Sequence, residues 1–149
     1  MRNNQLIWLN ITVMILICFS CSKEVDESIV LKEYLKTINI HNIEIFDYYI
    51  ILPIDNCSAC INKYKRFVAL NMDIDNLKII ICSADKKKAK ILSGSSTNIV
   101  IDKKYNLSIK YPLIDNSVKV FKIKDKKIKN SFELKPSELP LNEIFTSVY

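Results

Sequence analysis

Two cysteines in a Cys-X-X-Cys pattern are the residues of this chain best suited to covalent chemistry. Cys57 and Cys60 enclose Ser58 and Ala59, where the apolar stretch 48–54 gives way to a helix-patterned stretch that starts at Ser58. Two thiols three residues apart on a first helical turn lie on one face, and the peptide dipoles place partial positive charge near the first sulfur. We therefore expect Cys57 to ionise more easily than a free thiol and to undergo thiol-disulfide exchange.

Other interpretations of these cysteines stay open. The pair could form a static disulfide, or have no redox role, on a non-catalytic module used for binding or assembly. A metal site would need Cys57, Cys60, Cys82 and the single histidine, His41, as four soft ligands. His41 precedes the first strand and is expected in a surface loop, while Cys82 ends another strand and faces either the motif or the opposite side. We predict no metal and no cofactor, and Cys82 fits a small buried hydrophobe better than a third redox thiol.

The N-terminus has the pattern of a secretion signal. Met1 to Gln5 include one basic residue, and a mainly apolar run from Leu6 to Phe19 precedes Ser20 and Cys21. This run of 14 residues is short for a membrane span, which needs about 20. An uncleaved membrane anchor and an ordinary signal peptide remain alternatives, and every interpretation places the rest of the chain outside the cytoplasm.

The same segment resembles the signal of bacterial lipoproteins, in which a small residue precedes a cysteine that is diacylated through its sulfur and becomes the new N-terminus. Ser20 and Cys21 fit that pattern, whereas Cys18 and Phe19 stand where the family has an aliphatic and a small residue. The resemblance implies a signal peptide over residues 1–20, lipidation of Cys21, a tether over 21–27 and a domain over 28–149. It also implies a membrane-anchored lipoprotein of the cell envelope that faces the periplasm or the exterior.

Composition limits the remaining possibilities. Removal of 20 residues from 149 leaves 129, enough for one domain with a core, and we expect a monomer. The chain carries a net charge of +6, and its lysines have little aromatic interleaving, which is typical of solvated faces. An exported protein seldom meets nucleic acid, so we do not assign the basic run Lys86–Lys90 to it. A single glycine excludes a glycine-rich phosphate loop.

Hydrophobic periodicity predicts alternating helices and strands up to Ile101. Ser28 is the expected N-cap of a helix that ends at Ile38. The stretch Ile43–Ile54 follows, and its last part is expected to form a central strand. An amphipathic helix is then expected from Ala59 to Met72. Leu77–Cys82 is expected as a parallel neighbour of the central strand, which gives a right-handed crossover. A short basic helix to Leu92, a turn at Gly94–Ser96 and a strand over Thr97–Ile101 follow.

The C-terminal part is expected to close the sheet. Asp102–Asn116 is interpreted as a loop, and the apolar residues from Val118 to Phe132 predict an antiparallel hairpin around Asp125-Lys126. A final helix from Ser137 to about Val148 would cover the sheet.

This order of elements resembles the thioredoxin-like fold, and more narrowly the membrane-anchored thiol-disulfide oxidoreductases that bacteria export. The resemblance implies an α/β three-layer sandwich with a central mixed sheet flanked by helices. It also implies that Cys57 attacks, that Cys60 resolves, and that the partners are protein thiols or disulfides. The chain departs from the family at three points: Asn56 replaces a tryptophan, neither glycine nor proline separates the cysteines, and Asn116-Ser117 stands where the family has a cis proline. The nearest proline, Pro112, comes about five residues too early.

Overall fold

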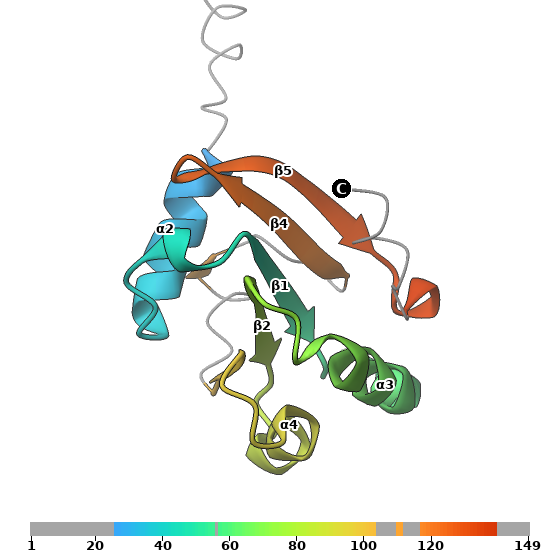
Figure 1. Ribbon diagram of the computed structural model, residues 1–149. Coiled ribbons are helices and arrows are strands. Elements are labelled where there is room, and N and C mark those ends of the chain that lie inside the picture. The colour runs from blue at the N-terminus through green and yellow to red at the C-terminus, as the bar shows by residue number, and fades with distance from the viewer. Residues whose placement is uncertain (1–25, 56, 104–109, 112–116, 140–149) are drawn as a thin grey trace, which may run out of the picture.

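The computed structural model describes residues 26–55, 57–103, 110–111 and 117–139. A five-stranded mixed sheet with strand order β3-β2-β1-β4-β5 lies at its centre (Figure 1). β1 pairs in parallel with β2 and antiparallel with β4, so the predicted central position of this strand is confirmed. The strands are β1 (Tyr48–Pro53), β2 (Leu77–Cys82), β3 (Ile99–Asp102), β4 (Val118–Lys124) and β5 (Lys127–Leu134).

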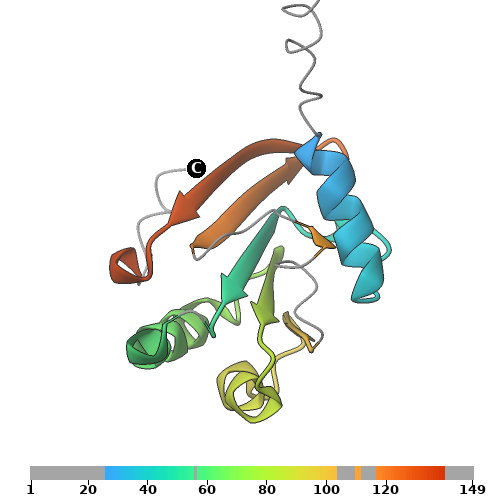
Figure 2. The ribbon, with the colours of Figure 1, turned by 180° about the vertical axis from the view of Figure 1, so that it is seen from behind.

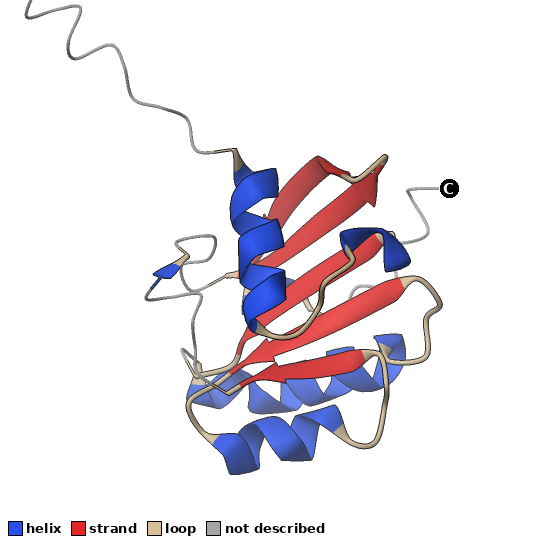
Figure 3. Ribbon diagram, turned by 90° about the vertical axis from the view of Figure 1, so that its left-hand side faces the viewer, coloured by secondary structure: helices blue, strands red, loops and turns tan. Residues whose placement is uncertain are grey.

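Helices cover both faces of this sheet, and the α/β class expected from the sequence is confirmed. α2 (Glu27–Thr37) packs on one face, while α3 (Ile61–Asn71) and α4 (Lys86–Ser93) lie side by side on the other (Figures 2 and 3). Short 3-10 turns complete the described elements: η1 (Ile43–Ile45), η2 (Ser58–Cys60) and η3 (Pro136–Glu138). In the described part of the chain, no helix has the length and apolar character needed to cross a membrane.

The apolar character of β1 on both faces follows from its position between two cores. Ile50 and Leu52 pack in the cluster beneath α3 and α4, and Tyr49 and Ile51 pack in the cluster beneath α2. All four side chains are fully buried. Because successive strand residues point to opposite faces, every position of a strand covered on both sides is buried and favours an apolar side chain.

The first described helix begins earlier than predicted. Asp26, and not Ser28, is the N-cap of α2: its carboxylate accepts a hydrogen bond from the Ser28 backbone N–H at 2.8 Å. A charged carboxylate both caps the first turn and complements the helix dipole. The Ser28 hydroxyl instead accepts a hydrogen bond from the Ile128 backbone N–H at 3.2 Å, which attaches α2 to β5.

Several other element boundaries also differ from the sequence-based prediction. Residues 43–45 form η1 ahead of β1, and β3 starts at Ile99, two residues later than predicted. The side chain of Asn98, in the turn before β3, donates a hydrogen bond to the Met72 carbonyl at 3.2 Å. The hairpin is confirmed: β4 pairs antiparallel with β5, and both turn residues have positive φ, 51° at Asp125 and 66° at Lys126. Residues 136–138 form η3, and the rest of the predicted final helix beyond Leu139 lies outside the described residues.

Candidate active site

The Cys57–Cys60 pair lies just beyond the carboxyl end of the central strand. The two residues form a disulfide, with their Cα atoms 5.2 Å apart. Cys57 precedes η2, and the Cys60 backbone N–H donates to the Cys57 carbonyl at 3.1 Å. The expected α-helix from Ser58 is therefore wrong in detail: η2 occupies that turn and α3 begins at Ile61, so both cysteines precede the α-helix.

The disulfide is partly accessible to solvent. Cys57 and Cys60 are both half-buried, whereas Ser58 and Ala59 between them are exposed. Cys60 also packs against the apolar cluster beneath α3 and α4. The turn that carries the pair therefore lies at the surface, with Cys60 on its inner side.

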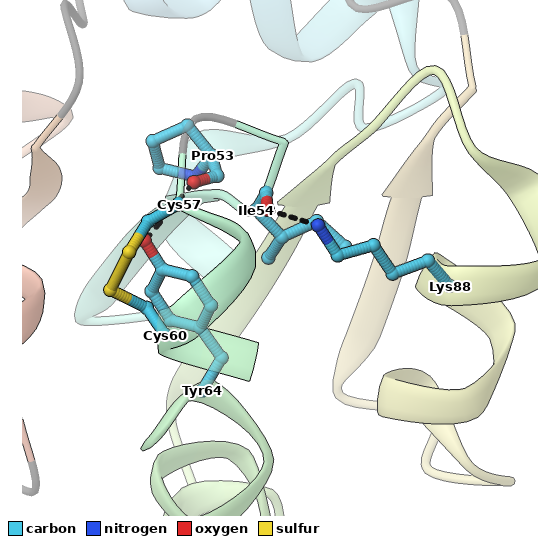
Figure 4. The surroundings of a disulfide bond; sticks show 6 residues. All are labelled: Pro53, Ile54, Cys57, Cys60, Tyr64 and Lys88. Atoms are coloured by element: carbon cyan, nitrogen blue, oxygen red, sulfur yellow. Dashed lines mark hydrogen bonds between the residues drawn. A yellow bond between two sulfur atoms is a disulfide. The ribbon is translucent and has the colours of Figure 1, made fainter. Parts of the chain in front are cut away.

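Two side chains from the helices fix the backbone that leads to the motif (Figure 4). The buried Tyr64 hydroxyl of α3 donates to the Pro53 carbonyl at 3.3 Å, and Lys88 Nζ of α4 donates to the Ile54 carbonyl at 2.6 Å. The Ile54 backbone N–H donates to the Cys82 carbonyl and extends the β1–β2 pairing by one residue. The carbonyls of Pro53 and Ile54, where the central strand ends, therefore have side-chain donors from two different helices.

Asp55 joins the motif loop to the end of the neighbouring strand. Its Oδ1 accepts from the Ser83 hydroxyl, and its Oδ2 accepts from the Ala84 backbone N–H, both at 2.6 Å. The Ser83 hydroxyl in turn accepts from the backbone N–H of Asp85, the N-cap of α4. The loop after β1 and the start of α4 are thus held together beside the disulfide.

Cys82 is separated from the disulfide by the sheet. Its side chain is 1% exposed and packs in the cluster beneath α2, whereas Cys60 packs on the opposite face, so the predicted burial of Cys82 is confirmed. The Tyr34 hydroxyl lies 3.6 Å from its sulfur and donates to Asp102 Oδ2 at 2.9 Å. Burial raises the pKa of the Cys82 thiol far above its usual range.

The residues considered for a metal site do not come together. His41 is exposed, as expected, in the segment between α2 and η1, and Cys82 faces away from Cys57 and Cys60. Among the described residues, no group of three or more histidine, cysteine, aspartate or glutamate side chains could hold a metal ion.

Several of the residues singled out from the sequence lie outside the described part of the chain. They include Cys21, the expected lipidation site, with Cys18 to Ser20 before it, Asn56 before the motif, and Pro112. Asn116 is also outside it, while Ser117 is described and donates from its hydroxyl to Glu133 Oε2 at 3.1 Å.

Sequence reasoning did not identify Asp55 and Lys88 as part of the site. The parallel register that pairs Pro53 with Cys82 places residues 55 and 83–84 at the same edge of the sheet. An aspartate directly after one predicted strand, opposite a serine directly after the neighbouring predicted strand, was the available signal for Asp55. The Lys88 contact had no such signal, because it depends on where α4 packs.

Comparisons of this chain with protein-family models, curated proteins and solved structures give no match.

Proposed function

We propose that this protein is an exported, lipid-anchored thiol-disulfide oxidoreductase of thioredoxin-like fold that acts through Cys57 and Cys60. The observation that carries the proposal is the half-buried disulfide between a central parallel strand and the helix that follows it. The neighbouring β2 and the antiparallel β4–β5 hairpin on the other side of β1 fit the same fold. Cys21 supplies the lipid attachment in this proposal.

In the oxidising direction, a substrate thiolate attacks Cys57 Sγ. The Cys57–Cys60 bond breaks, a substrate–Cys57 disulfide forms, and Cys60 leaves as a thiolate that takes a proton from solvent. A second substrate thiolate attacks the substrate sulfur of this mixed disulfide and releases Cys57. The substrate loses two electrons, and the protein gains them as a dithiol.

In the reducing direction, the same bonds are exchanged in reverse. Cys57 thiolate attacks a substrate disulfide, and Cys60 then attacks Cys57 Sγ and releases the reduced substrate. Turnover in this direction requires an external dithiol protein to reduce the Cys57–Cys60 bond again. The packing of Cys60 against the core supports its role as the resolving thiol, since the attacking sulfur must meet the substrate first.

The decisive experiment measures the reduction potential of the pair. The protein is equilibrated in glutathione or dithiothreitol buffers, and alkylated thiols are counted by mass. We expect a reversible two-electron transition confined to Cys57 and Cys60, with Cys57 alone alkylated rapidly at mildly acid pH. A reduction potential below about −300 mV is typical of structural disulfides in secreted proteins. Such a value for this pair would overturn the proposed enzymatic activity and favour the non-catalytic binding or assembly module.

Single-cysteine variants test the assigned roles. Cys60→Ser retains the attacking thiol and is expected to accumulate a mixed disulfide with a peptide disulfide probe. Cys57→Ser serves as the matched control and should accumulate far less. Equal trapping by both variants would contradict the assignment of Cys57 as the attacking thiol.

A further inference from the structure

Two parts of this protein carry most of its positive charge: the β4–β5 hairpin, with six lysines and two acidic residues over 118–134, and the helices α3 and α4. α3 and α4 together carry seven basic residues and no acidic residue. The whole chain has a net charge of +6, so the remainder of the chain sums to −1. Six of the seven side chains are exposed and define what we call the basic surface: Lys63, Lys65, Arg66, Lys86, Lys87 and Lys90.

The basic surface reaches the edge of the sheet that carries the disulfide. Lys63 lies one helical turn after Cys60, and residues three apart on a helix are neighbours. Lys86 and Lys87 form the first turn of α4, which Asp55 fastens to the motif loop through Ser83 and Ala84. The two helices are in contact with each other along the same face of the sheet (Figure 3).

Nearby carboxylates offset only part of this charge. Asp55 and Asp85 lie beside the start of α4, where they accept hydrogen bonds from the Ser83 hydroxyl and from the backbone N–H groups of residues 84, 87 and 88, and their two negative charges stand against the seven positive charges of the helices. Within the described residues, none of the six side chains of the basic surface is in a salt bridge with a carboxylate. Their charges therefore remain available to a partner.

We propose that the basic surface selects acidic polypeptides as the substrates or redox partners of the disulfide. This inference rests on the proposed thiol-disulfide exchange and adds the chemical class of the molecule that Cys57 meets. Glutamate and aspartate side chains that flank a partner's cysteine contact Lys63, Lys86 and Lys87 as its sulfur approaches Cys57. Complementary charge of this kind raises the association rate and is screened by salt.

A polypeptide fits this position better than the surface of the anchoring membrane. Hydrogen bonds from Ile128 to Ser28 and from Ser131 to Glu27 hold the start of α2 against the edge strand β5. Figure 1 shows this end of α2 beside the hairpin and far from α3 and α4. Four residues separate Cys21 from Asp26, and the five steps of chain between them span at most about 18 Å. A lipid on Cys21 would therefore hold the start of α2, and with it the hairpin, within that distance of the membrane.

Exchange rates with probes of defined charge test the proposal. Two peptides of equal length each carry one disulfide and differ only in the flanking residues, glutamate in one and lysine in the other; hydroxyethyl disulfide is the uncharged probe. With the reduced protein at low ionic strength, we expect the glutamate peptide to react at least about tenfold faster than the lysine peptide. At about 0.5 M salt this ratio should fall severalfold.

Two matched triple variants locate the effect. Lys63→Gln/Lys86→Gln/Lys87→Gln should lower the glutamate-to-lysine ratio at least about threefold. Lys124→Gln/Lys127→Gln/Lys129→Gln removes the same charge from the exposed hairpin and should leave the ratio unchanged. An equal fall in both variants would show an effect of net charge alone and overturn the proposal.

The probes also separate this inference from the proposed function. Reaction with hydroxyethyl disulfide but equal rates for both peptides would overturn only the selection of acidic partners. Absence of reaction with all three probes would overturn the exchange activity and the inference with it. If phosphatidylglycerol vesicles bind through Lys63, Lys86 and Lys87 while the peptides react equally, the basic surface is a membrane-binding surface and the assignment to polypeptides is wrong.

Discussion

Replacement of Asp55 by alanine should destabilise the edge of the sheet that carries the disulfide. The substitution removes hydrogen bonds from the Ser83 hydroxyl and the Ala84 backbone N–H to a carboxylate, each 2.6 Å long. Hydrogen bonds to charged groups contribute about 1.5–3 kcal/mol each. Ala84 is exposed, so water replaces the carboxylate there, whereas Ser83 is fully buried and keeps only the Asp85 carbonyl as an acceptor. We expect the free energy of unfolding to fall by about 2–3 kcal/mol.

Asp55→Asn separates the geometry of the contact from its charge. The amide oxygen can still accept from the Ala84 backbone N–H, and the amide NH₂ can donate to the Ser83 hydroxyl, which then donates to the Asp85 carbonyl. Both contacts survive as neutral hydrogen bonds, so the loss in unfolding free energy should stay below about 1 kcal/mol.

Urea unfolding of the oxidised protein measures both effects. The midpoint should shift for Asp55→Ala with no change in the dependence of the unfolding free energy on urea. Asp73→Ala, at an exposed position after α3, is the matched control and should stay within about 0.5 kcal/mol of the unsubstituted protein. The reasoning fails if Asp55→Ala also stays within that range, or if Asp55→Asn costs as much as Asp55→Ala.

Three further predictions concern the other face of the sheet. Tyr34→Phe removes a hydrogen bond to the buried Asp102 carboxylate and should lower the free energy of unfolding by about 2 kcal/mol. Thermal unfolding measures this loss, and an unchanged midpoint temperature would contradict the importance of the hydrogen bond. Cys82 should resist iodoacetamide until the protein unfolds, because burial both shields the thiol and raises its pKa; rapid labelling of native protein would contradict this. The hydrogen bond from Lys119 lowers the pKa of Glu27 below its ordinary value of 4.5, although partial burial opposes the shift and the Ser131 hydroxyl supports it. The ionised Glu27 therefore stabilises the folded protein above pH 4.5, and this stability is lost as the pH falls through the lowered pKa. Urea unfolding at pH 3 and pH 6 measures the effect: Glu27→Gln should reduce the difference in unfolding free energy between the two pH values by less than about 1 kcal/mol.

The continuous apolar runs were the most informative part of the sequence for the fold. Tyr48–Pro53 and Leu77–Cys82 contain residues that pack on both faces of the sheet, and such runs are typical of strands covered by helices on both sides. Asp125-Lys126 between two strand patterns gave the hairpin for the same local reason. These features depend on the spacing of apolar residues and on the residue types at the turn, and both can be read from the sequence.

Helix ends were harder to predict, because several polar residues compete for each cap. Asp26 and Ser28 can both cap a first turn. The packing of β5 decides between them, because the Ile128 backbone N–H of β5 donates to the Ser28 hydroxyl and Asp26 caps the helix. Around the disulfide the same limit applies to Lys88, whose Nζ finds the Ile54 carbonyl only after α4 docks on the sheet. The sequence pattern thus does not predict side-chain contacts between separate helices and strands.

The period of β2 keeps the third thiol away from the disulfide. Leu77, Ile79 and Ile81 face α3 and α4, so Ile80 and Cys82 must face α2. A slip of one residue would bring Cys82 to the side of Cys60, but it would also turn all three apolar side chains out of their core. Exchange between Cys82 and the pair is therefore opposed by the same burial that holds the sheet together, so the proposed exchange of Cys57 and Cys60 with a partner meets no competing thiol from β2.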